Sequence, residues 1–117
     1  MSYYPKQGDI IWLDFDPTLG REQQGHRPAV VISNRLFNKF GNGIALVAPI
    51  TNTDKGISIH IKLDERTKTT GVILTDQAKI LDLSKRKAEL AERMPADITQ
   101  RVCAIVSSFS EYEGEAR

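Results

Sequence analysis

Short apolar runs separated by polar turns fill most of the chain. The run over 9–15 is almost continuously apolar, which is typical of a buried strand. Residues 29–33 and 43–50 form two similar runs. Pro28 cannot donate to a ladder and therefore suits the entry of the strand over 29–33. Between these strands, 34–42 is predicted to be a connection with one helical turn.

Strict alternation marks the segment that follows. Apolar residues occupy every second position from 57 to 63, the period of a half-buried strand. On such a strand His60 points outward, to solvent or to an interface. The polar stretch 64–70 is then expected to be a hairpin loop.

Two further apolar stretches, 71–74 and 78–83, are divided by three polar residues. This interruption at 75–77 indicates a bulge or a tight turn at one rim of a sheet. Residues 85–94 remain open between helix and strand, because their Lys, Glu, Ala and Leu content favours a helix but the segment is short.

An amphipathic helix is predicted from Pro95 onward, with Pro95 suited to its first turn and Asp97 complementing the helix dipole. Its apolar face comprises Ile98, Val102, Ile105, Val106 and Phe109. Several short strands followed by one helix predict a mainly β (α+β) fold, a small curled sheet or barrel covered by a C-terminal helix. The 117 residues fit one domain, and the segment 1–117 contains no repeat or linker.

Composition narrows the function classes. The net charge is +1, so any nucleic-acid site must be a local basic patch rather than an overall basic surface. Cys103 is the only cysteine, which excludes an internal disulfide and a cysteine-based zinc site and fits a reducing cytoplasm. No apolar stretch has the length of a signal peptide core or a membrane span. We therefore expect a soluble cytoplasmic protein with no membrane partner and no metal or other cofactor.

The polar loop between the first two strands carries the most distinctive motif. This loop, 16–27, is too long for a simple hairpin turn and is dense in hydrogen-bonding side chains. Together with its flanks it resembles the MazF/PemK toxin family. The matching residues are Gly8, Asp9, Trp12, Asp14 to Thr18, Gly20, Glu22, Gln23, Gly25, Arg27, Pro28 to Val31, Val47 to Thr51, Lys55, Gly56, Gly71, Val72 and Asp76 to Lys79.

The resemblance implies a fold, an activity and partners. It implies a small SH3-like β-barrel that acts as a homodimer, with two RNA channels formed with the help of the dimer interface. The implied activity is that of a type II toxin, a sequence-specific endoribonuclease that cuts single-stranded RNA without a metal. The implied inhibitor is a cognate antitoxin whose disordered acidic tail competes with RNA for basic residues such as Arg27 and Lys79.

RNA cleavage without a metal uses the 2′-OH of the substrate as nucleophile, and the protein must then stabilise the charge that develops on the phosphate. The planar guanidinium of Arg27 suits two phosphate oxygens, and the Thr51 hydroxyl could add a further donor. By resemblance, catalysis falls to Arg27, Thr51 and Glu22. Glu22 and His26 both remain candidates for the general base.

RNA-binding roles follow from the same resemblance. The residues concerned are Asp16, Thr18, Arg21, Gln23, His26, Lys55, Asp76, Gln77 and Lys79. In Kid-like members of the family, catalysis is attributed to a His, an Arg and an Asp. The matching positions in this sequence are Arg21, Leu74 and Asp76. Because only the aspartate is retained, we favour the pair of Arg27 and Thr51.

Several residues also have structural interpretations. Trp12 is expected in the core or at a dimer contact, and Cys103 as a small packed residue. A metal pair of Asp14 and Asp16 is weakly supported, because no third ligand lies nearby in the sequence, and a turn role for Asp16 at Asp-Pro is favoured.

Two rival functions remain open at this point. A CcdB-type gyrase poison shares the expected fold, but that activity is associated with a Trp-Gly-Ile C-terminus and this chain ends in Glu-Ala-Arg. A non-catalytic RNA-binding barrel should be more basic and carry exposed aromatic side chains, for which eight aromatic residues, several of them in predicted core strands, give little support.

Overall fold

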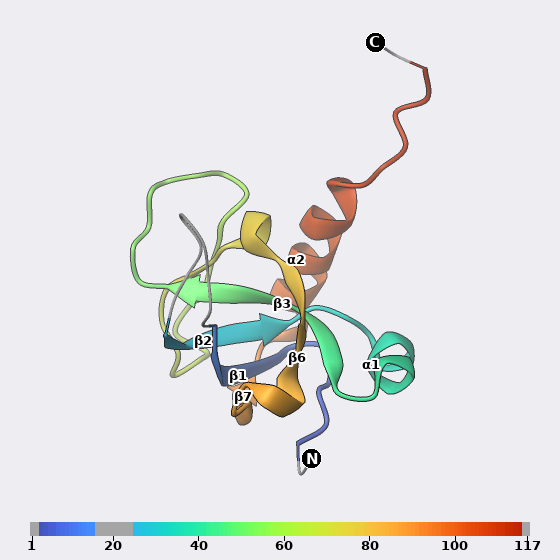
Figure 1. The fold of residues 1–117 in the computed structure, drawn as a ribbon. Coiled ribbons are helices and arrows are strands. Elements are labelled where there is room, and N and C mark those ends of the chain that lie inside the picture. Colours follow the sequence, from blue (N-terminus) through green and yellow to red (C-terminus); the bar gives the residue numbers. More distant parts are fainter. Residues whose placement is uncertain (1–2, 16–24, 116–117) are drawn as a thin grey trace.

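The structure, a computed structural model, describes residues 3–15 and 25–115. A curved, half-barrel sheet of seven strands forms the body, and a helix near the C-terminus lies across one of its faces (Figure 1). The strands are β1 (Asp9–Asp14), β2 (His26–Val31), β3 (Ile44–Thr51), β4 (Ile61–Lys62), β5 (Val72–Ile73), β6 (Lys79–Asp82) and β7 (Glu89–Arg93); the helices are α1 (Arg35–Gly41) and α2 (Ala96–Ser108), and the 3-10 turns η1 (Thr75–Gln77) and η2 (Leu83–Lys85). The prediction of a mainly β fold with a C-terminal helix is confirmed.

Both faces of the sheet are buried against apolar clusters. One cluster joins alternate residues of the central strands, such as Val30 and Ile50, to Ile98 and Val102 of α2. The second cluster is formed by the intervening residues of the same strands, whose side chains point to the opposite face; they include Leu13, Phe15, Ala29, Val31, Val47 and Leu81. Burial on both faces explains why the central strands have continuous apolar runs rather than alternation.

The strand β3 organises the sheet. One of its edges pairs with β2, and the other pairs first with β6 and then with β5. From the Ile50–Ile73 pair to the Val47–Lys79 pair, β3 advances three residues while its partner strand advances six. The surplus residues form η1, so of the predicted bulge or tight turn at 75–77 the turn is confirmed, as a 3-10 turn that projects from the sheet edge.

The strand β2 begins earlier than the sequence indicates. It starts at His26 rather than after Pro28, and Pro28 pairs with Trp12 inside the ladder. Pairing of β2 with β3 begins at Ala29, so the missing N–H of Pro28 lies just outside that ladder. The assignment of Pro28 to the strand entry is therefore wrong by two residues.

Most of the alternating segment is not a strand. Only Ile61 and Lys62 belong to β4, while residues 57–60 form a turn closed by the His60 N–H and the Ile57 carbonyl, 3.0 Å apart. The buried Thr75 hydroxyl also donates to the Ile59 carbonyl at 2.8 Å, which fastens this turn to η1. These hydrogen bonds override the apolar pattern.

The ambiguous segment resolves as strand β7, paired antiparallel with β1. Its residues have moderate helix propensity, but the edge of β1 offers backbone hydrogen bonds that only an extended segment can form. These tertiary contacts outweigh the local helix propensity. Among the described residues, no helix has the length and apolarity that a membrane crossing requires.

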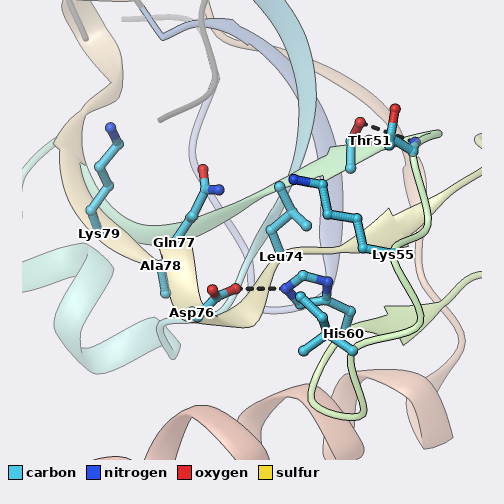
Figure 2. A pocket seen from close by; sticks show the side chains of 10 residues that line it. Thr51, Lys55, His60, Leu74, Asp76, Gln77, Ala78 and Lys79 are labelled. Atoms are coloured by element: carbon cyan, nitrogen blue, oxygen red, sulfur yellow. Dashed lines mark hydrogen bonds and ion pairs between the residues drawn. The ribbon is translucent and has the colours of Figure 1, made fainter. Parts of the chain in front are cut away.

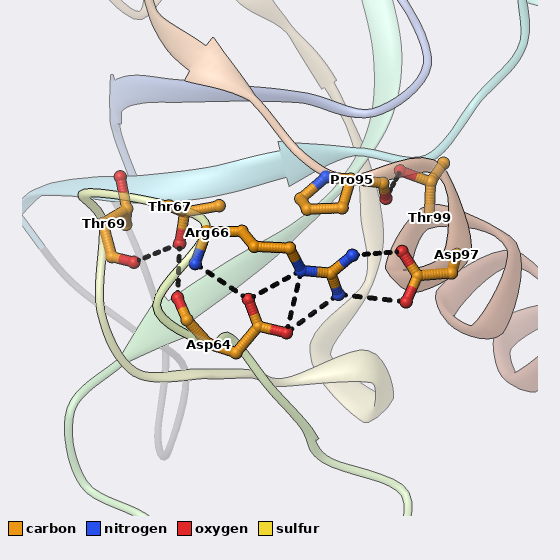
Figure 3. Close-up of polar contacts among 7 residues, drawn as sticks. All are labelled: Asp64, Arg66, Thr67, Thr69, Pro95, Asp97 and Thr99. Atoms are coloured by element: carbon orange, nitrogen blue, oxygen red, sulfur yellow. Dashed lines mark hydrogen bonds and ion pairs between the residues drawn. The ribbon is translucent and has the colours of Figure 1, made fainter.

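The hairpin between β4 and β5 is fastened to distant elements, and we call its loop, residues 64–70, the hairpin loop. Arg66 forms paired hydrogen bonds with Asp64 and with Asp97 of α2 at 2.8–3.2 Å (Figure 3). Hydrogen bonding to Arg66 holds the pKa of both carboxyl groups below its usual range.

A second carboxylate closes the hairpin loop from the other side. Glu92 of β7 accepts from the backbone N–H groups of Lys68 and Thr69 at 3.1 and 2.7 Å and from the Thr69 hydroxyl at 2.8 Å. Burial alone would raise the pKa of Glu92, but these hydrogen bonds outweigh it, and its pKa lies below its usual value.

Candidate functional site

Thr51 is the last residue of β3. The pairing of β2 with β3 ends at Ala29 and Pro49, and the same register continued by two residues would place Arg27 opposite Thr51. Opposed residues of an antiparallel pair direct their side chains to the same face. Arg27 therefore emerges on the same face of the sheet as Thr51, the face whose apolar cluster contains Ala29 and Val47.

Lys79 adds a cation to this face. It opens β6, pairs with Val47 of β3, and places its Nζ 5.7 Å from the centre of the Phe15 ring. Lys79 thus emerges on the same face as Arg27 and Thr51, and the contact with the aromatic ring restricts its side chain. Lys79 and Arg27 are the two cations that β6 and β2 contribute to this face.

A groove of about 690 Å³ runs from the end of β3 to η1. Its lining residues are Thr51, Thr53, Lys55, Ile57, His60, Leu74, Asp76, Gln77, Ala78 and Lys79. The structure thus brings five of the predicted site residues together: Thr51, Lys55, Asp76, Gln77 and Lys79 (Figure 2). Arg27 is not among the lining residues.

The turn η1 supplies the floor at one end. Because η1 holds the residues in excess of β3, it carries Asp76 and Gln77 away from the ladder and into the groove. Asp76 Oδ1 lies 2.7 Å from His60 Nε2 (Figure 2). The sequence interpretation of His60 as an outward side chain is wrong, because only 5 % of that side chain is exposed.

His26 is directed away from this site within the protomer. Adjacent residues of a strand face opposite sides, so His26 projects from the other face than Arg27. Its ring stacks on Trp12 with 5.7 Å between centroids, and its Nδ1 lies 2.7 Å from Asp14 Oδ1. Trp12 is 39 % exposed, so the core alternative of its sequence interpretation is wrong.

The remaining predicted site residues lie outside the described residues. These are Asp16, Thr18, Arg21, Glu22 and Gln23. Within residues 3–15 and 25–115, no group of three or more His, Cys, Asp or Glu side chains is placed to hold a metal ion. Cys103 is partly buried, which raises the pKa of its thiol, and its expected role as a packed side chain is confirmed.

Gly71 determines how closely the hairpin approaches Thr51. Its φ is +121°, and a Cβ there would overlap the carbonyl oxygen of Thr51. Any side chain at position 71 would displace either β5 or the end of β3. A glycine far from the chemistry in sequence therefore positions the Thr51 backbone.

Comparison with known proteins defines the family. A sequence model of the PemK-like, MazF-like toxin of type II toxin-antitoxin systems matches residues 6–109. The chain belongs to this family. Relatives within the MazF/PemK family include the endoribonuclease toxin MazF of Escherichia coli strain K12, 44 % identical over 86 residues that cover 74 % of this chain and 76 % of that protein. The endoribonuclease PemK of Escherichia coli is 32 % identical over 108 residues, covering 89 % and 80 %.

Solved structures of MazF/PemK family members share the fold. MazF from Deinococcus radiodurans superposes with a TM-score of 0.84 at 34 % identity, covering 92 % of this chain and 96 % of that one. The MazF chain in a MazE–MazF structure from the same organism gives a TM-score of 0.79 over the same shares.

Proposed function

We propose that the chain is a toxin endoribonuclease that cuts single-stranded RNA in a sequence-specific manner, using residues 1–117 as one domain. The observation that carries this proposal is that Thr51, Lys55 and Lys79 line one groove, so that a hydroxyl and two ammonium groups meet there. Arg27 projects from the same face of the sheet as Thr51 and Lys79. Such an array of donors and positive charge suits a phosphodiester.

The reaction follows from what the substrate itself provides. The 2′-oxygen attacks the adjacent phosphorus, a new P–O2′ bond forms, and the P–O5′ bond breaks. The 2′-OH proton passes to a base on the protein, and the leaving 5′-oxygen takes up a proton. The products are a 2′,3′-cyclic phosphate, which water can open to a 3′-phosphate, and a 5′-hydroxyl; no metal is required for any of these steps.

The side chains divide this work. Arg27 neutralises the charge that builds on the phosphate oxygens, and the Thr51 hydroxyl donates a further hydrogen bond to them. The position of His26 on the opposite face of the sheet favours Glu22 as the base. Lys55, Gln77 and Lys79 hold the neighbouring nucleotides, together with Asp16, Thr18, Arg21 and Gln23.

We further propose a homodimer in the cytoplasm, controlled by an antitoxin. Relatives from Deinococcus radiodurans have been solved as MazE–MazF assemblies, and a mycobacterial endoribonuclease has been solved in complex with its cognate antitoxin. A disordered acidic tail would be attracted to Arg27 and Lys79 by charge and would exclude RNA from the groove.

The test is to incubate the protein with mixed-sequence RNA in excess EDTA and to map the ends. We expect fragments with 5′-hydroxyl and cyclic or 3′-phosphate ends, lost in Arg27→Ala and blocked by 2′-deoxy substitution at the cut. Arg101→Ala, an exposed arginine on α2, is the matched control and should cut normally. Intact RNA with wild-type protein would contradict the proposal.

A further inference from the structure

His60 is a buried side chain at the end of the groove, and it fixes the direction of Asp76. Its Nε2 lies 2.7 Å from Asp76 Oδ1, and 5 % of its side chain is exposed. A carboxylate only accepts hydrogen bonds, so the hydrogen between them belongs to Nε2. The imidazole therefore holds one oxygen of Asp76 and leaves the second oxygen to point elsewhere.

The other ring nitrogen shows that this arrangement is not optimal for stability. His60 Nδ1 is buried and has no hydrogen-bond partner among the residues that the structure describes. Buried polar atoms without partners are uncommon in folded proteins, and each calls for an explanation. An apolar side chain at position 60 would fill the same space without that penalty, so the bond to Asp76 is the feature that histidine supplies.

Asp76 presents its second oxygen to the groove. Its side chain is 48 % exposed, it lines the groove, and within the described part of the chain it accepts a hydrogen bond only from His60. The result is a hydrogen-bond acceptor held in a fixed direction at the groove surface. Ile57 and Leu74 line the groove beside it and provide apolar walls.

The carboxylate stands apart from the phosphate-binding groups. Figure 2 shows Thr51 at the upper right and the His60–Asp76 pair below it, with the Lys55 side chain between them. A flat ring between apolar walls, with a polar group at its edge, is how proteins bind unstacked RNA bases. The geometry therefore suits a base next to the cut rather than the cut itself.

We propose that the His60–Asp76 pair recognises an RNA base whose pairing edge carries an amino group beside a ring nitrogen acceptor, adenine or cytosine. The proposal rests on the proposed ribonuclease function and names part of its sequence preference. A carboxylate oxygen accepts from the N6 amino group of adenine or the N4 amino group of cytosine and opposes the carbonyl of uracil. Guanine is best held by both oxygens of a carboxylate, and here His60 occupies one. Asp76 contacts the base and His60 is its positioning residue.

The experiment compares cleavage preferences of wild type, Asp76→Asn, His60→Gln and His60→Leu on a random-sequence RNA, with Glu65→Gln as control. We expect wild type to require adenine or cytosine at one position. Asp76→Asn, which can donate, should shift that position toward uracil or guanine by about tenfold or more. His60→Leu should relax the position, and His60→Gln, whose amide can still donate to Asp76, should retain it.

Three results would overturn the inference: an Asp76→Asn preference identical to wild type, a slower rate on every RNA with unchanged preference, or a wild-type requirement for guanine or uracil at the position that Asp76→Asn alters. Thermal unfolding identifies any variant that does not fold, and Asp76→Asn, with its half-exposed side chain, decides the matter if His60→Leu does not.

The same preference can be measured without cleavage, by sequencing the random-sequence RNA, made non-cleavable by 2′-deoxy substitution, that the protein retains. Wild-type protein that cuts no RNA would contradict the proposed function. Retained RNA without a position that Asp76→Asn alters would contradict this inference alone, so the two failures are distinguishable.

Discussion

The loops on the two sides of β4 are built in opposite ways. Residues 53–58, which we call the site loop, are all exposed, and their hydrogen bonds are local, such as Gly56 N–H to Asp54 and Thr53 N–H to Thr51. The hairpin loop, 64–70, is instead bonded to α2 through Arg66 and to β7 through Glu92 (Figure 3).

This contrast separates stability from recognition. The hairpin loop keeps β4 and β5 in place through side chains far away in sequence. The site loop then needs few contacts of its own and leaves Lys55 and Ile57 accessible to a ligand in the groove. Substitutions in the two loops should therefore affect different measurements.

The largest expected effect is on catalysis, at the end of β3 that leads into the site loop. Thr51→Val keeps the shape of the side chain and removes its hydroxyl, and we expect RNA cleavage to fall by about 10²–10³-fold, the usual effect of losing one donor to a charged transition state. The free energy of unfolding should change little. Rates under single-turnover conditions test this, with Thr70→Val, an exposed threonine of the hairpin loop, as control; a rate within a few-fold of wild type would remove Thr51 from the mechanism.

The next effect is on stability, in the hairpin loop. Glu92→Gln replaces an acceptor oxygen with an amide nitrogen that cannot accept from Lys68 or Thr69, and the free energy of unfolding should fall by about 1–2 kcal/mol. Cleavage at a temperature where the variant is folded should match wild type. Urea unfolding measures the change, and Glu65→Gln, an exposed glutamate of the same loop, should leave it unaltered. Impaired cleavage by folded Glu92→Gln would contradict the conclusion that the hairpin loop serves stability and not recognition.

A smaller effect should appear with pH. The folded-state pKa values of Asp64, Glu92 and Asp97 lie below their ordinary values, so their stabilising contribution is present above about pH 4.5 and is lost as the pH falls through the lowered values. Unfolding free energy should therefore decrease below that pH. Arg66→Met should weaken this dependence, because it removes the partner of both aspartates; an unchanged pH profile would argue against the ion pairs in solution.

The smallest effect concerns salt. Lys55→Ala should weaken binding of non-cleavable, 2′-deoxy-substituted RNA modestly and lower the slope of log affinity against log salt by about 0.7, as expected for one lost phosphate contact on a single strand. Lys68→Ala in the hairpin loop should leave the slope as in wild type. Equal slopes for wild type and Lys55→Ala would place the RNA outside the groove.

The sequence was informative where burial or a motif was local. The central strands and α2 follow from their apolar runs, because both faces of the sheet and one face of the helix are covered. The segment of β7 could not be assigned, since only the edge of β1 determines its conformation. The convergence of Arg27 with Thr51 came from family resemblance, and the β2–β3 register supports it.

His60 illustrates the limit of pattern analysis. Its neighbours alternate as in a strand, but a turn and the Thr75 hydroxyl reshape the segment. The contact with Asp76 depends on the three residues by which the chain between β5 and β6 exceeds the paired length of β3. This excess can be counted only when the pairing of the strands is known, so the sequence alone does not show it.

Gly71 has only a hydrogen atom as its side chain, so a substitution there offers a way to lower activity without changing any reacting group. Adding one methyl group there would push the Thr51 carbonyl aside while every functional group stayed present. The effect of the position of Thr51 could then be measured separately from the identity of the reacting groups, with side chains of increasing volume at a residue that does not line the groove.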